Sequence, residues 1–294
     1  MKPPAFAYAA PKTLDETLAL LARHGEDAKV LAGGQSLVPL LNFRLARPEL
    51  LIDVNRVTGL AGVRRVAGTL RIGALTRHAA VERSLLVTRH WPLLSEAIGC
   101  VAHAQIRNRG TIGGSVAHAD PAAEIPVVLT ALDARFHVAS TRGRRVLDCG
   151  EMFVDQLQSG IALDELLTEI ELPPMPQAAG SAWLEFARRH GDYALGGAGA
   201  VLSLDGAGRI ASAAIALLGA GRVPLRASAA ELGLRGAAPE LPAFTQAAAD
   251  AVRDIEPAGS IHGSSAYRRD LIGTLVRRAL VTAAERATRQ EEPA

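Results

Sequence analysis

Two short glycine segments constrain this chain more than any other feature. The first is Ala32-Gly33-Gly34-Gln35-Ser36, and the second is Thr111-Ile112-Gly113-Gly114-Ser115. Paired glycines permit positive φ angles and let backbone N–H groups approach a ligand without a Cβ in the way. Consecutive N–H groups form a nest for an anion, and a neighbouring hydroxyl adds a donor. Together the segments predict a pyrophosphate site, although one Gly-Gly pair alone, among 28 glycines, is more simply a turn.

Other phosphate-binding motifs do not fit the sequence. Neither segment continues into the Gly-Lys-Ser/Thr of a P-loop, and neither has the GxGxxG spacing of a dinucleotide-binding βαβ unit. The run Gly196–Ala200 lacks the final glycine of that fingerprint. Asp53 follows Gly33 at about the spacing of a ribose-binding acid, but this is a single matching feature. The sequence therefore argues against a conventional Rossmann domain.

The two cysteines, Cys100 and Cys149, restrict the redox chemistry. Two thiols cannot hold an iron–sulfur cluster, which takes four cysteine ligands, and they exclude a disulfide scaffold. The eight histidines form no HExxH or HxH pattern, so no metal site is predicted. Scattered cysteines are typical of reduced thiols, and so of a cytoplasmic protein. Any redox chemistry must then come from an organic cofactor.

Charge and hydropathy exclude further classes of partner. The 32 basic and 30 acidic residues give a net charge of +2, which argues against nucleic acid as the main partner. No apolar run reaches the roughly 18–20 residues of a membrane helix, so no integral membrane segment is expected. The N-terminal residues lack the continuous hydrophobic region of a secretion signal.

The hydrophobic pattern predicts an α+β fold. Thr13 and Glu16 have the spacing of a capping box at the start of a helix, which Gly25 ends. The run Leu129–Ala139 is predicted as a strand, and Asp120 as the N-cap of a helix. Further expected elements are strands at 29–32, 50–54 and 144–147, hairpins at 63–72 and 201–218, helices at 76–86, 92–102, 244–255 and 266–287, a break at 107–110, and a linker at 172–176.

Four segments resemble motifs of one family. Lys29–Leu37 with Asn42–Pro48, and then Ile106–Pro121, are similar to the two FAD motifs in the flavoprotein subunit of the molybdenum hydroxylases. Phe186–Ala194 and Ile261–Arg269 resemble the segments that open and close the C-terminal domain of that subunit. The family includes the medium subunits of xanthine, carbon monoxide, quinoline, nicotine and caffeine dehydrogenases. The resemblance covers nearly the whole chain, in the family's order.

The resemblance implies a two-subdomain, PCMH-type FAD-binding fold followed by a smaller α+β C-terminal domain of antiparallel sheet plus helices. The implied domains are 1–58 and 59–176 for the two FAD-binding subdomains and 177–294 for the C-terminal domain. In this family FAD lies in a cleft between the two subdomains, and both glycine segments contact its phosphates. The cofactor-binding residues implied are Lys29, Leu31, Ala32, Gly33, Gly34, Gln35, Ser36, Leu37, Val101, Thr111, Gly113, Gly114, Ser115, Glu124, Leu167 and Tyr193.

Several of these positions have a second interpretation. Val101 and Leu167 fit core packing at least as well as nucleotide contact. Tyr193 is similar to an aromatic residue that covers the isoalloxazine ring in some relatives, but an ordinary tyrosine is the alternative. Glu185 stands where relatives carry a lysine that contacts the flavin, so the resemblance does not imply that contact here. Asp120 is best explained by local capping, and the resemblance implies no catalytic residue and no metal ligand.

The resemblance implies an electron-transfer subunit that carries FAD. A large partner subunit with a molybdenum cofactor hydroxylates the substrate, and a small partner subunit carries two 2Fe-2S clusters. A dimer of heterotrimers is the expected assembly, and an N-heteroaromatic compound or an alkaloid is the expected substrate. One alternative is a free-standing PCMH-type flavin oxidoreductase that acts directly on a small molecule. Another is an assembly subunit that has lost its flavin.

Overall fold

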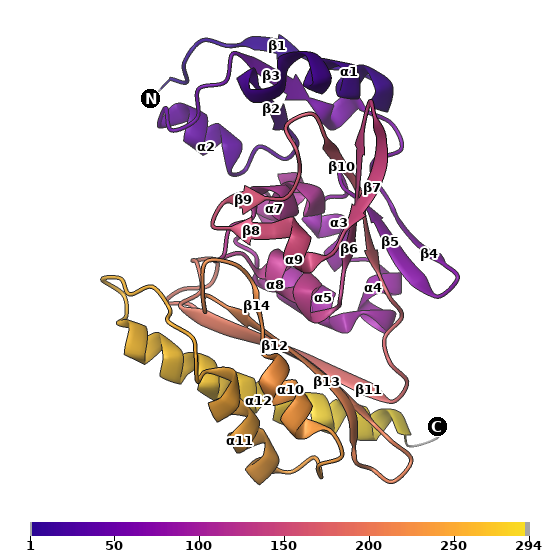
Figure 1. Ribbon diagram of the computed structural model, residues 1–294, viewed down its shortest axis with the longest axis vertical. Helices are drawn as coiled ribbons and strands as arrows, with labels where there is room; N and C mark the ends of the chain where they lie inside the picture. Colours follow the sequence, from indigo (N-terminus) through magenta and orange to yellow (C-terminus); the bar gives the residue numbers. More distant parts are fainter. Residues whose placement is uncertain (1, 292–294) are drawn as a thin grey trace.

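The computed structural model describes residues 2–291, within which the strands form four sheets (Figure 1). A small sheet lies at the N-terminal end, a five-stranded sheet in the middle, and a four-stranded sheet with long helices at the C-terminal end. A two-stranded hairpin completes the set. Helices connect parallel strands in the first sheet, whereas the other sheets are antiparallel, and the predicted α+β fold class is confirmed.

The first sheet is parallel, with the strand order β1-β3-β2. The capping box is confirmed: the Thr13 side chain accepts the Glu16 N–H, and the Glu16 carboxylate accepts the Thr13 N–H. Gly25 ends this helix as predicted, because its N–H donates to the carbonyl of Leu21. The elements are β1 (Ala7–Ala9), α1 (Leu14–His24), η1 (Gly25–Asp27), β2 (Ala28–Leu31), α2 (Leu37–Asn42), β3 (Leu50–Asp53) and η2 (Val54–Arg56).

The second sheet is antiparallel, with the order β4-β5-β10-β6-β7. The predicted hairpin is present, and its turn residues Ala67 and Gly68 both have positive φ. The strands are β4 (Val63–Val66), β5 (Thr69–Gly73), β6 (Arg135–Ser140), β7 (Gly143–Leu147) and β10 (Leu166–Leu172). Between them lie α3 (His78–Glu82), α4 (Leu85–His90), α5 (Pro92–Cys100), α6 (Ala104–Arg109), α7 (Ile112–His118), α8 (Glu124–Ala131), α9 (Cys149–Met152), β8 (Phe153–Asp155) and β9 (Gln158–Ser159).

The structure corrects four predictions in this region. The run Leu129–Ala139 is not one strand, because α8 extends to Ala131 and β6 begins only at Arg135. Every residue of α8 is buried, so its sequence carries no amphipathic period. The predicted helix at 76–86 is two short helices, and the predicted break at 107–110 is helical as far as Arg109. Asp120 does not cap α8; it accepts the N–H of Ala122 in the preceding turn.

The third sheet is antiparallel, with the order β11-β12-β13-β14. All nine residues of β12 are buried. The helix α12 packs on one side of the third sheet, and the part of the chain that carries the second sheet packs on the other side. A Cβ added to Gly180 would lie 2.0 Å from the Ala283 carbonyl oxygen, so α12 crosses β11 in backbone contact. The elements are β11 (Ala179–Phe186), β12 (Gly196–Leu204), β13 (Ile210–Leu218), β14 (Leu225–Arg226), α10 (Ser228–Leu234), α11 (Leu241–Ala251) and α12 (Ser265–Glu291).

The apolar core is divided unevenly. One cluster joins the second sheet to the third, and it includes Trp91, Trp183 and Leu218. A second cluster lies between the third sheet and its helices, and a smaller one, which includes Ile52, Ala139 and Leu166, joins the first sheet to the second. The Trp91 indole N–H donates to the Pro173 carbonyl at 2.8 Å, which anchors the predicted linker. The domain boundaries stay a prediction. None of the helices within residues 2–291 combines the length and the hydropathy needed to cross a membrane.

Candidate functional site

The two glycine segments lie against each other although they belong to different sheets. The first follows β2 directly, and the second follows α6. A Cβ added to Gly33 would stand 2.5 Å from the Arg109 carbonyl oxygen and 2.9 Å from the Cα of Gly110. A Cβ added to Gly114 would stand 3.9 Å from the Cβ of Ala32. Both segments therefore form one surface between the first and second sheets.

The first glycine segment presents free backbone donors. Within the described residues, the amides of Gly33, Gly34, Gln35 and Ser36 donate to no protein acceptor. Gly34 has φ +75°, the left-handed conformation that glycine adopts without a steric penalty. The segment's carbonyls are used instead, since Gly34 accepts from Val38 N–H and Gly33 accepts from the Gln35 side chain. Consecutive free amides of this kind bind an anionic oxygen.

The second glycine segment forms the first turn of a helix. Thr111 is the N-cap of α7, and its hydroxyl accepts the Gly114 N–H at 3.1 Å. Gly113 is glycine because of close packing: a Cβ there would lie 2.6 Å from the Cβ of Ala74. The amides of Gly113 and Ser115 are bonded to the carbonyls of Ala74 and Thr111. The hydroxyls of Thr111 and Ser115 are left as donors, because neither donates to an acceptor within residues 2–291.

The remaining residues of the first FAD motif surround its glycine segment. Lys29 is exposed on β2, and Leu31 is the last residue of that strand. Leu37 begins α2. The Cδ1 of Leu31 lies 3.3 Å from the position that a Cβ of Gly34 would take, so the Leu31 side chain packs against the turn at Gly34.

Val101 and Leu167 occupy different environments. Val101 follows α5, is half-buried, and accepts from the Arg107 guanidinium through its carbonyl at 3.0 Å. Leu167 is 5% exposed in β10, where it packs in the core that joins the second and third sheets.

Tyr193 lies in the connection between β11 and β12, which extends from the third sheet toward the helices beside the second sheet. A Cβ on the neighbouring Gly191 would lie 2.3 Å from the His103 ring, so the connection packs on the segment after α5. The Tyr193 side chain is 69% exposed. Its pKa is raised by partial desolvation of the hydroxyl and by the negative charge of Asp120, which places it beside the turn after α7. The ring is free to cover a ligand.

Glu124 begins α8 and is buried. Burial raises its pKa to about 8, and the nearby carboxylates of Glu185 and Asp120 act in the same direction. Glu185 itself accepts from the Trp183 indole N–H at 2.9 Å. Near neutral pH the Glu124 side chain is therefore a neutral carboxylic acid, which can donate a hydrogen bond as well as accept one.

Three polar residues beside the glycine segments were not predicted from the sequence. Asn55 and Arg77 hydrogen-bond to the chain next to each segment, at Ala32 and Arg109. His78 is buried against Gly110, with neither ring nitrogen hydrogen-bonded within the described residues, and burial lowers its pKa to about 4. Asn55 could have been found, because it follows β3 and the carboxyl ends of parallel strands meet at one edge of a sheet.

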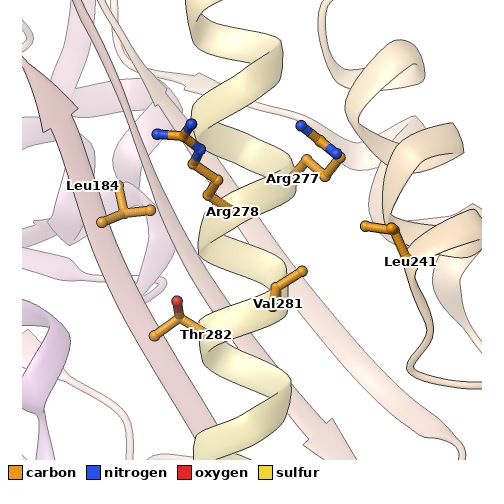
Figure 2. A pocket seen from close by; sticks show the side chains of 6 residues that line it. All are labelled: Leu184, Leu241, Arg277, Arg278, Val281 and Thr282. Atoms are coloured by element: carbon orange, nitrogen blue, oxygen red, sulfur yellow. The ribbon is translucent and has the colours of Figure 1, made fainter.

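The cavity in Figure 2 is not this site. It measures about 440 Å³ and lies on α12, lined by Leu184, Leu241, Arg277, Arg278, Val281 and Thr282. The glycine segments lie on other elements, beyond the third sheet (Figure 1). Among the described residues, no group of three or more His, Cys, Asp or Glu side chains could hold a metal ion. The chemistry that the site supports is the binding of a phosphorylated cofactor.

Comparison with known proteins identifies two family domains. Residues 4–175 match the FAD binding domain in molybdopterin dehydrogenase, and residues 181–283 match the CO dehydrogenase flavoprotein C-terminal domain. The 6-hydroxypseudooxynicotine dehydrogenase complex subunit alpha of Paenarthrobacter nicotinovorans is 48% identical over 292 residues, with 99% of each chain covered. The caffeine dehydrogenase subunit beta of Pseudomonas sp. (strain CBB1) is 42% identical over 289 residues, with 97% of each chain covered.

Solved structures agree with these matches. A chain of the carbon monoxide dehydrogenase from Hydrogenophaga pseudoflava superimposes with a TM-score of 0.94 and 39% identity, covering 97% of this chain and 99% of that one. A chain of quinoline 2-oxidoreductase from Pseudomonas putida 86 gives a TM-score of 0.93 and 38% identity, covering 98% and 99%. The family predicted from the four motifs is confirmed. The chain belongs to the FAD-binding medium subunits of the molybdenum hydroxylases.

Proposed function

We propose that this chain is the electron-transfer subunit of a three-subunit molybdenum hydroxylase. It receives electrons from the 2Fe-2S clusters of a small partner subunit and passes them through FAD to an external acceptor. A large partner subunit with the molybdenum cofactor hydroxylates the substrate. Two such heterotrimers associate as a dimer in the cytoplasm. The names of the relatives support this assignment of separate steps to separate subunits. The relatives are a subunit alpha, a subunit beta and a medium chain of dehydrogenases.

The run of free amides at Gly33–Ser36 carries the proposal. Its donors suit the pyrophosphate of FAD, because consecutive N–H groups need an anionic acceptor. The hydroxyls of Thr111 and Ser115 stand on the second segment, which contacts the first, so they can bind the same group. The residues present therefore fit the cofactor. When bound, FAD supplies a group that takes up electrons singly and releases one or two.

The other residues of the site have supporting roles in this proposal. Lys29, Leu31 and Leu37 flank the first segment, and Val101 and Leu167 pack beside the nucleotide. Glu124 is a neutral carboxylic acid that hydrogen-bonds the ribose. Tyr193 covers one face of the isoalloxazine ring, which its exposure permits. This chain supplies no general acid, base or metal for hydroxylation, since that chemistry belongs to the large subunit.

An N-heteroaromatic compound or an alkaloid is the substrate we propose. The support is the order of similarity: the relatives named for 6-hydroxypseudooxynicotine, caffeine and nicotine are 48%, 42% and 41% identical, whereas the carbon monoxide dehydrogenase medium chains are 37% and 36% identical.

Purification from the native host under mild conditions tests the proposal. We expect the chain to co-purify with a molybdenum-containing large subunit and an iron–sulfur small subunit, and to release FAD on denaturation. Mixing the complex with substrate should bleach the flavin absorbance, whereas the chain alone should show no such reduction. A chain that is isolated without partners and turns over a small molecule by itself would contradict the proposal.

A further inference from the structure

A chain of side-chain hydrogen bonds joins the two glycine segments. The Nδ2 of Asn55 donates to the carbonyl oxygen of Ala32 at 2.8 Å. The Oδ1 of Asn55 accepts from a guanidinium nitrogen of Arg77 at 2.6 Å, and the other terminal nitrogen of Arg77 donates to the carbonyl of Arg109 at 2.5 Å. Ala32 opens the first segment, and Arg109 lies two positions before the second. Two side chains therefore span the whole junction.

Neighbouring groups fix the orientation of the Asn55 amide. The Oδ1 of Asp53 accepts from the backbone N–H of Asn55 at 2.9 Å and from its Nδ2 at 2.6 Å. The Oδ2 of Asp53 accepts from the Tyr8 hydroxyl at 2.6 Å. The Asn55 Nδ2 thus faces two acceptors and its Oδ1 faces the Arg77 cation. The opposite orientation of the amide would place donors against donors.

Arg77 is held by its backbone as well as by its side chain. It forms an isolated antiparallel bridge with Thr111. On either side of it, His78 N–H donates to Gly110 and Ile112 N–H donates to Thr76, both at 3.0 Å. The Arg77 backbone is therefore fixed to the second glycine segment, and the guanidinium extends from it toward the first segment.

We propose that Asn55 and Arg77 are positioning residues that set the separation of the two glycine segments for the FAD pyrophosphate. This inference rests on the proposed function. A site whose donors are already in place loses less conformational freedom when the ligand binds, and so binds more tightly. We call the Asn55–Arg77 pair the clamp. It holds the two glycine segments in place although they belong to different sheets.

Fold stability alone does not explain this arrangement. The hydrogen bonds from Arg77 to Asn55 and Arg109 are solvent-exposed, and such bonds contribute about 1 kcal/mol or less to folding. A small apolar cluster around Ile52 already joins the first sheet to the second through Ala139 and Leu166, and it does not include Asn55 or Arg77. Loss of the clamp should therefore change the ligand site more than the stability of the chain.

The test measures the rate of FAD release from the chain. Flavin fluorescence after dilution gives this rate for wild type, Arg77→Met, Asn55→Ala and the double variant. We expect each single variant to release FAD at least tenfold faster, and the double variant to be no faster than the singles, because both residues belong to one chain of bonds. The melting temperature of the FAD-free protein should stay within about 3 °C of wild type.

Two more variants make the result specific. Arg77→Lys keeps the charge but reaches only one acceptor, so an intermediate rate is expected, and it replaces Arg77→Met if that variant does not fold. Arg209→Met is the matched control, because Arg209 also donates to a backbone carbonyl, that of Gly236, in the C-terminal region. It should release FAD at the wild-type rate.

The outcomes separate the clamp from the proposed function. A wild-type chain that holds no FAD overturns both. A wild-type chain that binds FAD, with Arg77→Met and Asn55→Ala within twofold of its release rate, overturns the clamp alone. Additive effects of the two substitutions, or equal acceleration by Arg209→Met, also contradict it.

Discussion

Gly33 touches the carbonyl group of Arg109, and there is no room for a Cβ between them: the added atom would lie 2.5 Å from the oxygen. Gly33→Ala should therefore push the two glycine segments apart. Backbone atoms stand on both sides of this contact, so no side-chain rotation can relieve it. We expect FAD affinity to fall at least tenfold, about 1.4 kcal/mol. Titration of the FAD-free chain with FAD, followed by flavin fluorescence, measures this.

Gly206→Ala is the control for that substitution. Gly206 lies in the exposed turn between β12 and β13, and nothing lies within 4 Å of the position its Cβ would take. Both variants add one methyl group to the chain. Equal FAD affinities for the two variants would show that the contact between the segments does not matter for the cofactor.

The sequence predicted the elements with local signals and missed those that depend on packing. The capping box at Thr13 and the turn at Ala67-Gly68 are local, and both are present. The run Ile125–Leu132 has no polar face because α8 lies between two sheets, so its helix could not be distinguished from a strand. Pro126 sits in the first turn of α8, where a helix does not need its N–H.

The candidate site shows the same division. Both glycine segments could be found from their composition, but the reasons for their glycines differ. Gly34 has a positive φ, as predicted, whereas Gly113 makes room for Ala74, a residue far away in the sequence. Asn55 and Arg77 carry no motif of their own, and only the meeting of two sheets makes them partners.

Acid should destabilise the fold through His78. Its pKa falls from the ordinary value of 6.5 to about 4 because the ring is buried. Between these values the unfolded chain binds a proton that the folded chain does not, so stability is lost as the pH falls from 6.5 toward 4. His78→Leu should remove this loss, worth about 1.4 kcal/mol per pKa unit. Urea unfolding at pH 7 and pH 5 compares the two proteins, and parallel losses in both would contradict the assignment to His78.

Glu124 should have the opposite dependence on pH. The folded chain holds its proton up to about pH 8, whereas the ordinary pKa of the group is 4.5. Between these values the folded state binds more protons, so raising the pH favours unfolding. Glu124→Gln keeps the shape without the ionisation. The stability of the variant relative to wild type should rise by at least about 1.4 kcal/mol from pH 5 to pH 8. Thermal unfolding at matched FAD occupancy measures it, and a constant difference would refute the prediction.

Gly180→Ala should destabilise the C-terminal region. A Cβ at this position would lie 2.0 Å from the Ala283 carbonyl oxygen and 2.4 Å from the Ala287 nitrogen, so α12 would have to move off β11. We expect a loss of roughly 3 kcal/mol or more in the free energy of unfolding, because neither contact is with a flexible side chain. Gly233→Ala, in an open position on α10, should stabilise the chain slightly or leave it unchanged. A wild-type denaturant midpoint for Gly180→Ala would show that the contact is looser than described.

The uneven division of the apolar core predicts the order in which the sheets fold and FAD binds. The second and third sheets share the most extensive cluster and should form together, whereas the first sheet is joined to the second by a smaller cluster, which includes Ala139 and Leu166, and by polar contacts. Because this junction has fewer apolar contacts, we expect the first sheet to open while the rest stays folded, and a newly made chain could take in FAD in that state. Binding of FAD and closure of the first sheet should then occur as one step. In the FAD-free chain, the backbone amide hydrogens of the first sheet should exchange with solvent faster than those of the other sheets.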